Sequence, residues 1–583
     1  MKTTIIRILI FFFVGSSYAQ VGIGTTNPQG ALDVNSTNMG IVLPRVTSLE
    51  TVTNADGSSP AVNGTMVYDV TRQKLCHRIN NQWVCTSVIN SGTTSTDIEI
   101  LLENDNSLYF KASNTEFSDQ FGRNVSISDD GTRMAISANL EGSDAVGVNG
   151  DESNNNLSRS GAVYLFYFDG TAWVQEAYLK ASNTGQDDWF GTSLAMSGNG
   201  SYLIVGSRFE DSNATGVNGN QSDNSASNSG AAYVFVRSGT TWSQQAYLKA
   251  SNTDANDLFG WKVSIDDTGS KVIVGALGED SNATGINGNQ SDNSASGAGA
   301  AYIFSRSGTT WSQDTYLKGS NTESGDEFGV SVFINGDGTR AAVSAFGENS
   351  AATGINGNEA DNTATDAGAA YVFLFNAGTW TQEAYIKASN TDANDDFGYG
   401  LTMSDDGSRL VVSTIREASS SIGVNGVETN NSFSNSGAVY IYSRSGTTWS
   451  QEAYVKATNT NPQDIFGYAI ALNDDGSRLL VGATSEDSNG RGLTGDPLNN
   501  TATNSGAAYA LQRSGSTWSH VAYIKSSNSE GIDGFGTALA INGDGTYIVV
   551  GAIGEDSNAT GIGGDQTDNS SSGSGAAYVI TPF

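Results

Sequence analysis

A polar segment rich in acidic and amide side chains recurs several times along the chain. The stretch "EDSNATGVNGNQSD" begins at Glu210, and a near-copy begins at Glu279. Carboxylates, amides and loop carbonyls are the ligand types of calcium, so these segments could hold that ion. The candidate metal ligands are Glu210, Asp211, Asn213, Asp223, Glu279, Asp280, Asn282 and Asp292.

A second interpretation gives the same glutamate a structural role. It stands at one place in every copy, as Glu141, Glu210, Glu279, Glu348, Glu417, Glu486 and Glu555. A lysine such as Lys180 or Lys249 is equally constant and could neutralise it. Identity between copies reports what each copy needs, which favours an ion-paired brace over a metal site. Calcium therefore stays the one cofactor that the sequence suggests, and no other is indicated.

Catalytic chemistry has little support in the residue types. The only histidines are His77 and His520, and no Cys–His or Ser–His arrangement is expected around them. A pair of carboxylates could still cleave a glycoside in so acidic a chain. We therefore expect no catalytic residue, with a carboxylate-based hydrolase or lyase as the alternative.

The net charge of the chain indicates which partners it can bind, and its first residues indicate where in or outside the cell it works. The chain of 583 residues carries 61 acidic against 28 basic side chains, a net charge of −33. This balance argues against nucleic acid and anionic membrane surfaces as partners. Residues 1–19 have the pattern of a secretory signal, with Lys2 and Arg7 before the apolar Ile8–Val14. We expect an exported protein, secreted or at the cell surface, with no membrane insertion.

The elements that position these residues follow from a repeat of 69 residues. Phe-Gly recurs in one register, at Phe121, Phe190, Phe259, Phe328, Phe397, Phe466 and Phe535. Each copy reads as four short strands separated by Gly, Asp and Ser turns, without helical periodicity. Seven such units predict an all-β, seven-bladed propeller spanning 107–583. The last copy lacks a fourth strand, and Ser107–Asn114 aligns with it, so we expect that segment to close the ring.

The polar segments occupy one face of such a propeller. With four antiparallel strands per blade, the loop between the second and third strands and the blade-to-blade connection emerge together. We call this side the decorated face. The opposite face carries only tight turns such as Asp129-Asp130-Gly131. Within the loops, Gly216 and Gly219 are expected to adopt positive φ, which glycine tolerates best.

These motifs resemble a known repeat family. Phe-Gly at the start of a strand, "IVGA" or "LVGA" and then "GAAYVF" are similar to FG-GAP repeats, as in the integrin α-subunit propeller. The resemblance implies a propeller used in adhesion. Two features depart from the family: the proline of "GAP" is missing, and so is the Asp-x-Asp-x-Asp-Gly calcium loop between the first two strands. The family's calcium ligands therefore cannot be carried over.

A separate module precedes the propeller. Residues 20–88 are expected to form a small β-rich unit and 89–106 a linker. "VGIGTTNPQGALDV" and "GIVLPRV" resemble a leader of Bacteroidetes surface proteins and phage tail-fibre segments. If Asn80-Asn81 forms a two-residue hairpin turn, Cys76 faces Cys85 at disulfide distance. Export would favour oxidation of this pair.

The sequence favours a binding or adhesion protein whose decorated face recognises an extracellular protein or glycan. Residues that vary between copies are better contact candidates than the constant glutamates, and Arg and aromatic side chains often dominate binding energy. The candidates are Arg208, Phe209, Phe346, Arg416 and Arg491. The identity of the ligand and the oligomeric state are not predicted.

Overall fold

The computed structural model describes residues 21–23, 32–34, 45–46, 52, 65–69, 74–79, 82–86 and 107–581. The chain divides into two compact units, Met1–Asn104 and Asp105–Phe583. The predicted signal and linker lie outside the described residues. Among these, the only helix is the short 3-10 turn η2 (Gly492–Thr494), and none is long and apolar enough to span a membrane.

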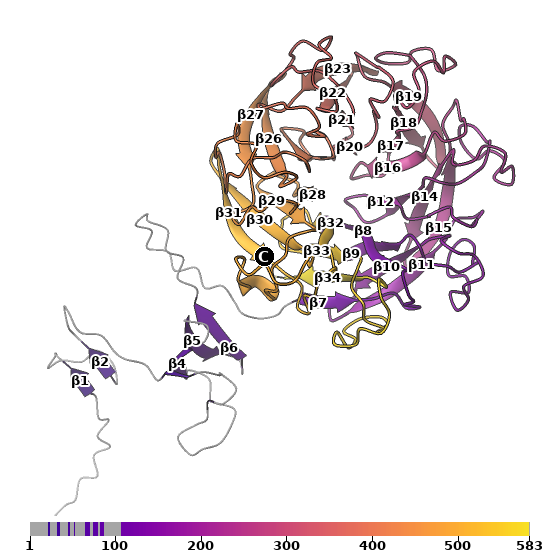
Figure 1. Cartoon of the computed structure of the whole chain (residues 1–583). Helices are drawn as coiled ribbons and strands as arrows, with labels where there is room; N and C mark the ends of the chain where they lie inside the picture. The colour runs from indigo at the N-terminus through magenta and orange to yellow at the C-terminus, as the bar shows by residue number, and fades with distance from the viewer. Residues whose placement is uncertain are drawn as a thin grey trace, which may run out of the picture. The chain divides into compact units, whose positions relative to one another are not determined.

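The second unit is a ring of seven four-stranded antiparallel sheets, as predicted (Figure 1). The innermost strands are β8 (Phe121–Ile127), β12 (Ser193–Met196), β16 (Phe259–Ile265), β20 (Val332–Ile334), β24 (Gly400–Met403), β28 (Phe466–Leu472) and β32 (Phe535–Ile541). The second strands are β9 (Arg133–Ala138), β13 (Tyr202–Ser207), β17 (Lys271–Ala276), β21 (Arg340–Ala345), β25 (Arg409–Thr414), β29 (Arg478–Ala483) and β33 (Ile548–Ala552).

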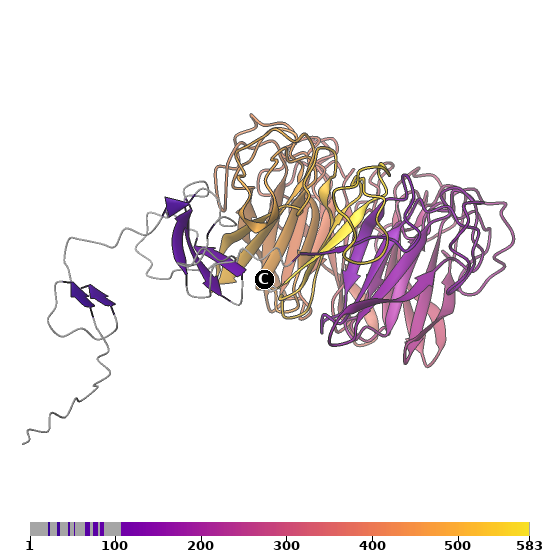
Figure 2. The ribbon, with the colours of Figure 1, turned by 90° about the horizontal axis from the view of Figure 1, so that it is seen from below.

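The outer half of each blade is a hairpin that carries most of the buried aromatic side chains. The third strands are β10 (Ala162–Phe168), β14 (Ala231–Ser238), β18 (Ala300–Ser307), β22 (Ala369–Asn376), β26 (Ala438–Ser445), β30 (Ala507–Ser514) and β34 (Ala576–Ile580). The outermost strands are β11 (Trp173–Leu179), β15 (Thr241–Leu248), β19 (Thr310–Leu317), β23 (Thr379–Ile386), β27 (Thr448–Val455), β31 (Thr517–Ile524) and β7 (Ser107–Phe110). Figure 2 shows the sheets from the side.

The seventh blade is completed by the amino-terminal strand, as predicted. β7 pairs antiparallel with β34, with Phe110 opposite Ala577 and Ser107 opposite Ile580. Tyr109 and Phe110 are fully buried there. Residues more than 460 positions apart in the chain thus share one sheet, because Ser107 and Ile580 are paired. Closure completes the last blade, so all seven blades have four strands.

The Phe-Gly motif is explained by the way neighbouring blades meet. Phe259 is fully buried and lies edge-on against Tyr302 in its own blade, 5.4 Å between ring centroids. Gly260 has φ +89, and a Cβ there would lie 2.2 Å from the carbonyl oxygen of Ala231 in the preceding blade. Gly230, which opens "GAAYVF", pairs in parallel with Phe259. Both glycines are therefore needed for one blade to dock on the next.

The first unit contains two small sheets. β1 (Val21–Ile23) pairs in parallel with β2 (Leu32–Val34). β3 (Arg45–Val46), β4 (Met66–Asp69), β5 (Lys74–Ile79) and β6 (Gln82–Thr86) form the other. The backbone register of β5 and β6 places Cys76 opposite Cys85 and Ile79 opposite Gln82, as expected for the hairpin. The disulfide itself stays a prediction.

We predict that Cys76→Ser/Cys85→Ser will leave the propeller's melting temperature unchanged. The cross-link would close only a short loop, and its entropic stabilisation is at the low end of the usual range. Thermal unfolding of the variant and the wild type checks this. A shift of the propeller transition would mean that the hairpin supports the ring.

Candidate functional site at one end of the channel

Each long loop is fixed at its base by a buried ion pair between the constant glutamate and the constant lysine. The seven pairs are Lys180–Glu141, Lys249–Glu210, Lys318–Glu279, Lys387–Glu348, Lys456–Glu417, Lys525–Glu486 and Lys111–Glu555. Their N–O distances are 2.7–3.0 Å and their side chains are at most 1% exposed. The brace interpretation of the glutamates therefore agrees with their geometry.

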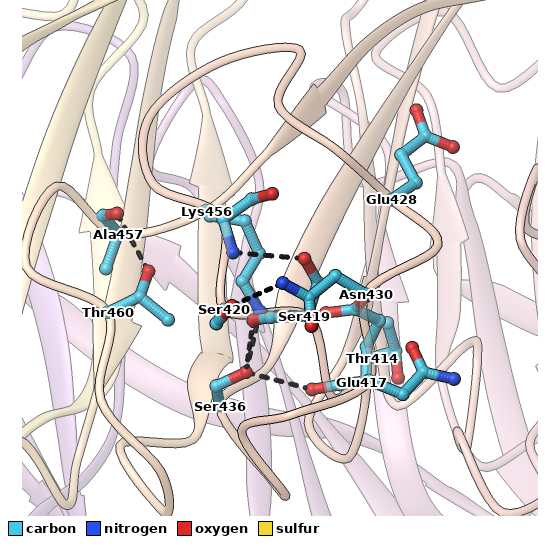
Figure 3. Close-up of polar contacts among 12 residues, drawn as sticks. Thr414, Glu417, Ser419, Ser420, Glu428, Asn430, Ser436, Lys456, Ala457 and Thr460 are labelled. Carbon is cyan, nitrogen blue, oxygen red and sulfur yellow. Dashed lines mark hydrogen bonds and ion pairs between the residues drawn. The ribbon is translucent and has the colours of Figure 1, made fainter.

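Blade five shows how the brace is assembled (Figure 3). Lys456 Nζ donates to Glu417 Oε2 at 2.7 Å and to Ser436 Oγ at 2.7 Å. Ser436 Oγ in turn donates to the backbone carbonyls of Glu417 and Ser419. Tyr454 Oη donates to Glu417 Oε1 at 2.8 Å. The loop's start, its end and the outer strand are thus joined by one charged group.

The candidate metal ligands are engaged in the same loop contacts. Glu210 accepts from Lys249, Asn183 and Tyr247, and Glu279 accepts from the corresponding residues of the next blade. Asp211 and Asp280 accept backbone N–H groups near the loop's end. Asn213 and Asn282 donate backbone N–H groups to the carbonyls of Asp223 and Asp292. The described residues contain no group of three or more His, Cys, Asp or Glu that could hold an ion. Calcium binding stays an untested hypothesis that this geometry does not favour.

The middle of each loop lies against the outermost strand of its own blade. Val217 forms a bridge with Leu248, and Asn218 Oδ1 accepts the N–H of Tyr247 at 2.9 Å. Gly216 has φ +69, as predicted, but Gly219 does not adopt positive φ. Asn218 takes that conformation instead, and Gly219 is needed because a Cβ there would meet Ala214 Cβ at 2.7 Å. These contacts hold the loops over the periphery of the ring.

The centre of the ring is an open channel. A cavity of about 490 Å³ is lined by the innermost strands of all seven blades. Its two ends differ, because each innermost strand starts at the decorated face and finishes at a tight turn. Residues that follow the Phe-Gly motif or the second strand lie at the decorated end. Residues of the turns lie at the other end.

The decorated end carries cations and aromatic rings that break the repeat. They are Arg123, Arg208, Trp261, Lys262, Phe346, Tyr399 and Tyr468. Arg123, Trp261, Tyr399 and Tyr468 occupy one repeat position, which other blades fill with Thr or Val. Lys262 stands where other blades have Asn, Ser, Gly or Ala. We call Arg123, Arg208 and Lys262 the cation cluster, and Trp261, Phe346, Tyr399 and Tyr468 the aromatic wall.

Arg208 is held between aromatic rings. Its guanidinium carbon lies 4.7 Å from the ring centroids of Trp189 and Phe209 and 4.3 Å from that of Trp261. Its Nε is buried and has no hydrogen-bond partner among the described residues. Burial, and then the positive charge of Arg123, lower the pKa of Arg208 to about 10. The rings cover the faces of the guanidinium by cation–π contact and fix its orientation.

The other members of the cluster are close enough to influence each other. Burial, followed by the charges of Arg123 and Arg208, lowers the pKa of Lys262 to about 8. Tyr399 and Tyr468 have ring centroids 5.5 Å apart, and burial raises the pKa of Tyr399 while Arg123 opposes that rise. With Phe346 of blade four, side chains from blades one to six therefore line one end of the channel.

Aspartates line the opposite end. They are Asp129, Asp267, Asp405 and Asp474. Their turns are joined around the axis by backbone bonds, including Asp405 N–H to the carbonyl of Asp474 and Gly543 N–H to that of Asp129. Burial, and then the neighbouring aspartates, raise the pKa of Asp129 to about 7 and of Asp405 to about 8. The channel is thus cationic at the decorated end and acidic at the other.

The five binding candidates derived from the sequence lie in separate places in the structure. Arg208 and Phe346 line the channel. The ring of Phe209 contacts the guanidinium of Arg208 and lies edge-on to Trp189, with 4.9 Å between the two ring centroids. Arg416 is half-exposed and pairs with Asp396 at 3.0 Å, outside the channel lining. Arg491 is exposed beside η2. These five residues therefore do not form one site.

Sequence reasoning missed Arg123, Trp261, Lys262, Tyr399 and Tyr468. Their signal was present as variation between copies at inward positions of the innermost strands, just after Phe-Gly. His520, on the outermost strand β31, is half-buried, with its Nε2 2.9 Å from the carbonyl oxygen of Lys456. Burial lowers the pKa of His520 to about 4.

A second constant acid is buried just before each innermost strand. The aspartates two residues before Phe-Gly are Asp119, Asp188, Asp257, Asp326, Asp395, Asp464 and Asp533. Each is buried and accepts a backbone N–H three residues upstream, such as that of Asp254 for Asp257 at 2.7 Å. Burial raises the pKa of Asp257 to about 8 and those of the other six to about 7.

We predict that the propeller's melting temperature falls as the pH rises from about 5 to about 8. Folding raises these pKa values, so the folded state binds more protons than the unfolded chain in that window. The resulting stability is complete below the unfolded pKa and is lost as the pH passes the folded pKa. Thermal unfolding at constant ionic strength measures it. Asp257→Asn keeps the acceptor and removes one titration, so its slope should be shallower; an equal or higher melting temperature at the alkaline end would contradict the prediction.

Comparisons with known proteins agree with the architecture. Residues 22–97 match the family described as a phage tail like trimerisation region. A second family, the FG-GAP repeat, matches residues 110–166, 173–235, 242–304, 311–373, 380–442 and 449–511. A search of curated proteins finds no match.

Solved structures resemble the chain only distantly. The propeller domain of Cps50 (Swd1) from Myceliophteria thermophila shares 7% identity with a TM-score of 0.42, covering 82% of this chain and all of that one. The periplasmic gluconolactonase of Pseudomonas aeruginosa shares 10% identity with a TM-score of 0.40, covering 77% and 93%. At these scores the likenesses carry no functional inference. The FG-GAP matches cover more than half of the chain, which therefore belongs to the FG-GAP repeat family.

Proposed function

We propose that this chain is an exported binding protein, secreted or at the cell surface, that recognises an extracellular protein or glycan. Its recognition site is the decorated end of the channel. The observation that carries the proposal is the break in the repeat at this end: cationic and aromatic side chains from several blades replace the smaller residues of the other blades and line one cavity. A binding site for one ligand needs an arrangement that occurs once in the ring. The seven ion-paired braces are equivalent and do not provide such an arrangement.

The chemistry of the decorated end suits binding. Rings and charged donors around a preformed cavity are the usual composition of a ligand site. The middle of the loops bridges to the outermost strands, away from the innermost strands that line the cavity. The rings around Arg208 hold its side chain in place before any ligand arrives, which reduces the entropy lost on binding.

The alternative is a carbohydrate-active hydrolase or lyase with carboxylates at the channel mouth. Such an enzyme needs an acid and a base beside the bound sugar. Among the described residues that line the decorated end, none is Asp or Glu. The lining aspartates stand at the tight-turn end instead. Binding without turnover is therefore the better-supported function.

Protein and glycan arrays probed with residues 20–583 test the proposal, with and without calcium. An Arg123→Gln/Lys262→Gln variant should lose the wild-type signals, because it removes two donors at the decorated end. Arg491→Gln is the matched control, since Arg491 is an exposed arginine outside the channel lining. Equal loss in the control, or no loss in the channel variant, would refute this location. Release of a shortened glycan during incubation would support the enzymatic alternative.

We also propose that the amino-terminal unit joins three chains and so presents three propellers to one surface. The support is the match of residues 22–97 to a phage tail like trimerisation region. Three linked sites would raise the overall avidity for a repetitive ligand without new contacts. Light scattering should give three times the chain mass for residues 20–583 and one chain mass for 101–583. One chain mass for both would contradict trimerisation.

A further inference from the structure

The cation cluster differs from the seven constant lysines of the propeller. All seven constant lysines have a glutamate partner within 3.0 Å. In the part of the chain that the structure describes, Arg123, Arg208 and Lys262 have no carboxylate partner. The chain as a whole carries a net charge of −33, so acidic partners are abundant elsewhere. Three partly buried cations that line one cavity without a carboxylate partner favour an anion among them.

The cations repel one another in the free protein. Arg123 depresses the pKa of both other members, and Arg208 depresses that of Lys262. An anion bound among them would relieve this repulsion and supply hydrogen-bond acceptors. Arg208 has its faces covered by rings, while its Nε–H is left without an acceptor. A guanidinium that lines the cavity with its faces covered by rings suits a planar oxyanion in its own plane.

The aromatic wall adds a second requirement. Trp261 is adjacent in sequence to Lys262 and lines the same cavity, together with Tyr399 and Tyr468. These rings offer flat apolar surface with a polar rim at the two tyrosines. A ligand that fits must therefore carry an anionic group next to a face of C–H bonds. Sugar rings that bear a carboxylate or a sulfate have both features.

We infer that the decorated end of the channel binds an acidic sugar residue, with its anionic group among Arg123, Arg208 and Lys262 and its ring against the aromatic wall. This assignment rests on the proposed function and names the ligand class of the same site. The cavity of about 490 Å³ runs from the decorated end to the aspartates at the tight-turn end, and as a whole it belongs to the size range of small-ligand pockets, about 300–1,000 Å³. A terminal or single inner residue of a glycan would enter it, while the rest of the glycan remains on the decorated face.

Isothermal titration with residues 20–583 tests the assignment. The probes are a galacturonate oligosaccharide, a sulfated galactose oligosaccharide of the same length and the neutral galactose oligosaccharide. At least one acidic probe should bind more tightly than the neutral one, and the preferred acidic probe tells carboxylate from sulfate. Each of Arg123→Gln and Lys262→Gln should weaken that binding by about tenfold or more, as expected for lost charge-assisted hydrogen bonds. Arg491→Gln should leave it unchanged.

Two results would overturn the inference. Equal affinity for acidic and neutral probes would show that the anionic group is not recognised. Unchanged affinity in both glutamine variants would show that the sugar does not bind at the cation cluster. The melting temperatures of the variants show whether they are folded; if either is unfolded, Lys262→Arg, which keeps the charge, must retain binding. Array signals from a neutral glycan or an acidic peptide that disappear in the channel variant would reject the acidic sugar and leave the proposed function intact. Array signals that survive in that variant would reject the binding location as well.

Discussion

Removal of residues 101–115 will lower the melting temperature of the propeller by about 10 °C or more. The deletion takes away β7, whose Tyr109 and Phe110 are fully buried and whose backbone completes the sheet of blade seven. It also removes Lys111, so Glu555 loses its partner at 2.9 Å in a buried site. Loss of one large buried aromatic side chain alone commonly costs about 3–5 kcal/mol. Differential scanning calorimetry measures the shift.

The control for this prediction is a chain that begins at residue 101. It lacks the amino-terminal unit but retains β7, and its propeller should melt at the wild-type temperature. A Lys111→Met variant removes the ion pair but keeps the strand. Its melting temperature should lie between that of the chain without 101–115 and that of the control. If the chain without 101–115 melts at the wild-type temperature, the ring does not depend on closure by β7.

Glu279→Gln will destabilise the propeller by about 3–5 kcal/mol, the usual cost of leaving one member of a buried ion pair alone. Glu279 Oε2 accepts from Lys318 at 2.9 Å, and its Oε1 accepts from Tyr316 and Asn252. The side chain is 1% exposed, so water cannot replace the lost charge. Limited proteolysis should cut the loop of blade three before the other six loops, and chemical denaturation gives the energy.

Blade two offers a matched comparison. Lys249 donates both to Glu210 and to Ser229 Oγ at 2.7 Å, whereas blade three has Ala298 at the position of Ser229. Glu210→Gln should therefore cost less than Glu279→Gln, because its lysine keeps one acceptor. Replacing both members of the pair, as Glu279→Gln/Lys318→Met, should recover much of the loss. Tight calcium binding that disappears in Glu279→Gln would instead make the loop a metal site and refute the brace.

The architecture was predictable because every copy repeats the same local signals. Phe-Gly marks both the start of an innermost strand and the place where two blades dock, so one motif in register fixes the strand order and the blade count. The role of Glu279 followed from its constancy and from an equally constant lysine. In the hairpin, the spacing of Cys76 and Cys85 around the turn predicted their register.

The site was not predictable from the loops, for a physical reason. Arg123 and Tyr399 are four blades apart in sequence, and they meet only because the ring closes around a common axis. Nothing local to either residue reports that closeness. The error at Gly219 has a different origin. Asn218 has φ +55 and accepts a backbone N–H with its side chain, so an asparagine took the conformation that was assigned to glycine.

The most direct test of the account is a crystal structure of residues 20–583 with the tightest-binding glycan from the arrays. We predict that the bound ligand lies at the decorated end of the channel, within hydrogen-bond distance of Arg123 and Lys262 and in contact with Trp261 or Tyr399. A ligand bound on the outer loops near Arg491, or beside Asp405 at the tight-turn end, would contradict the account.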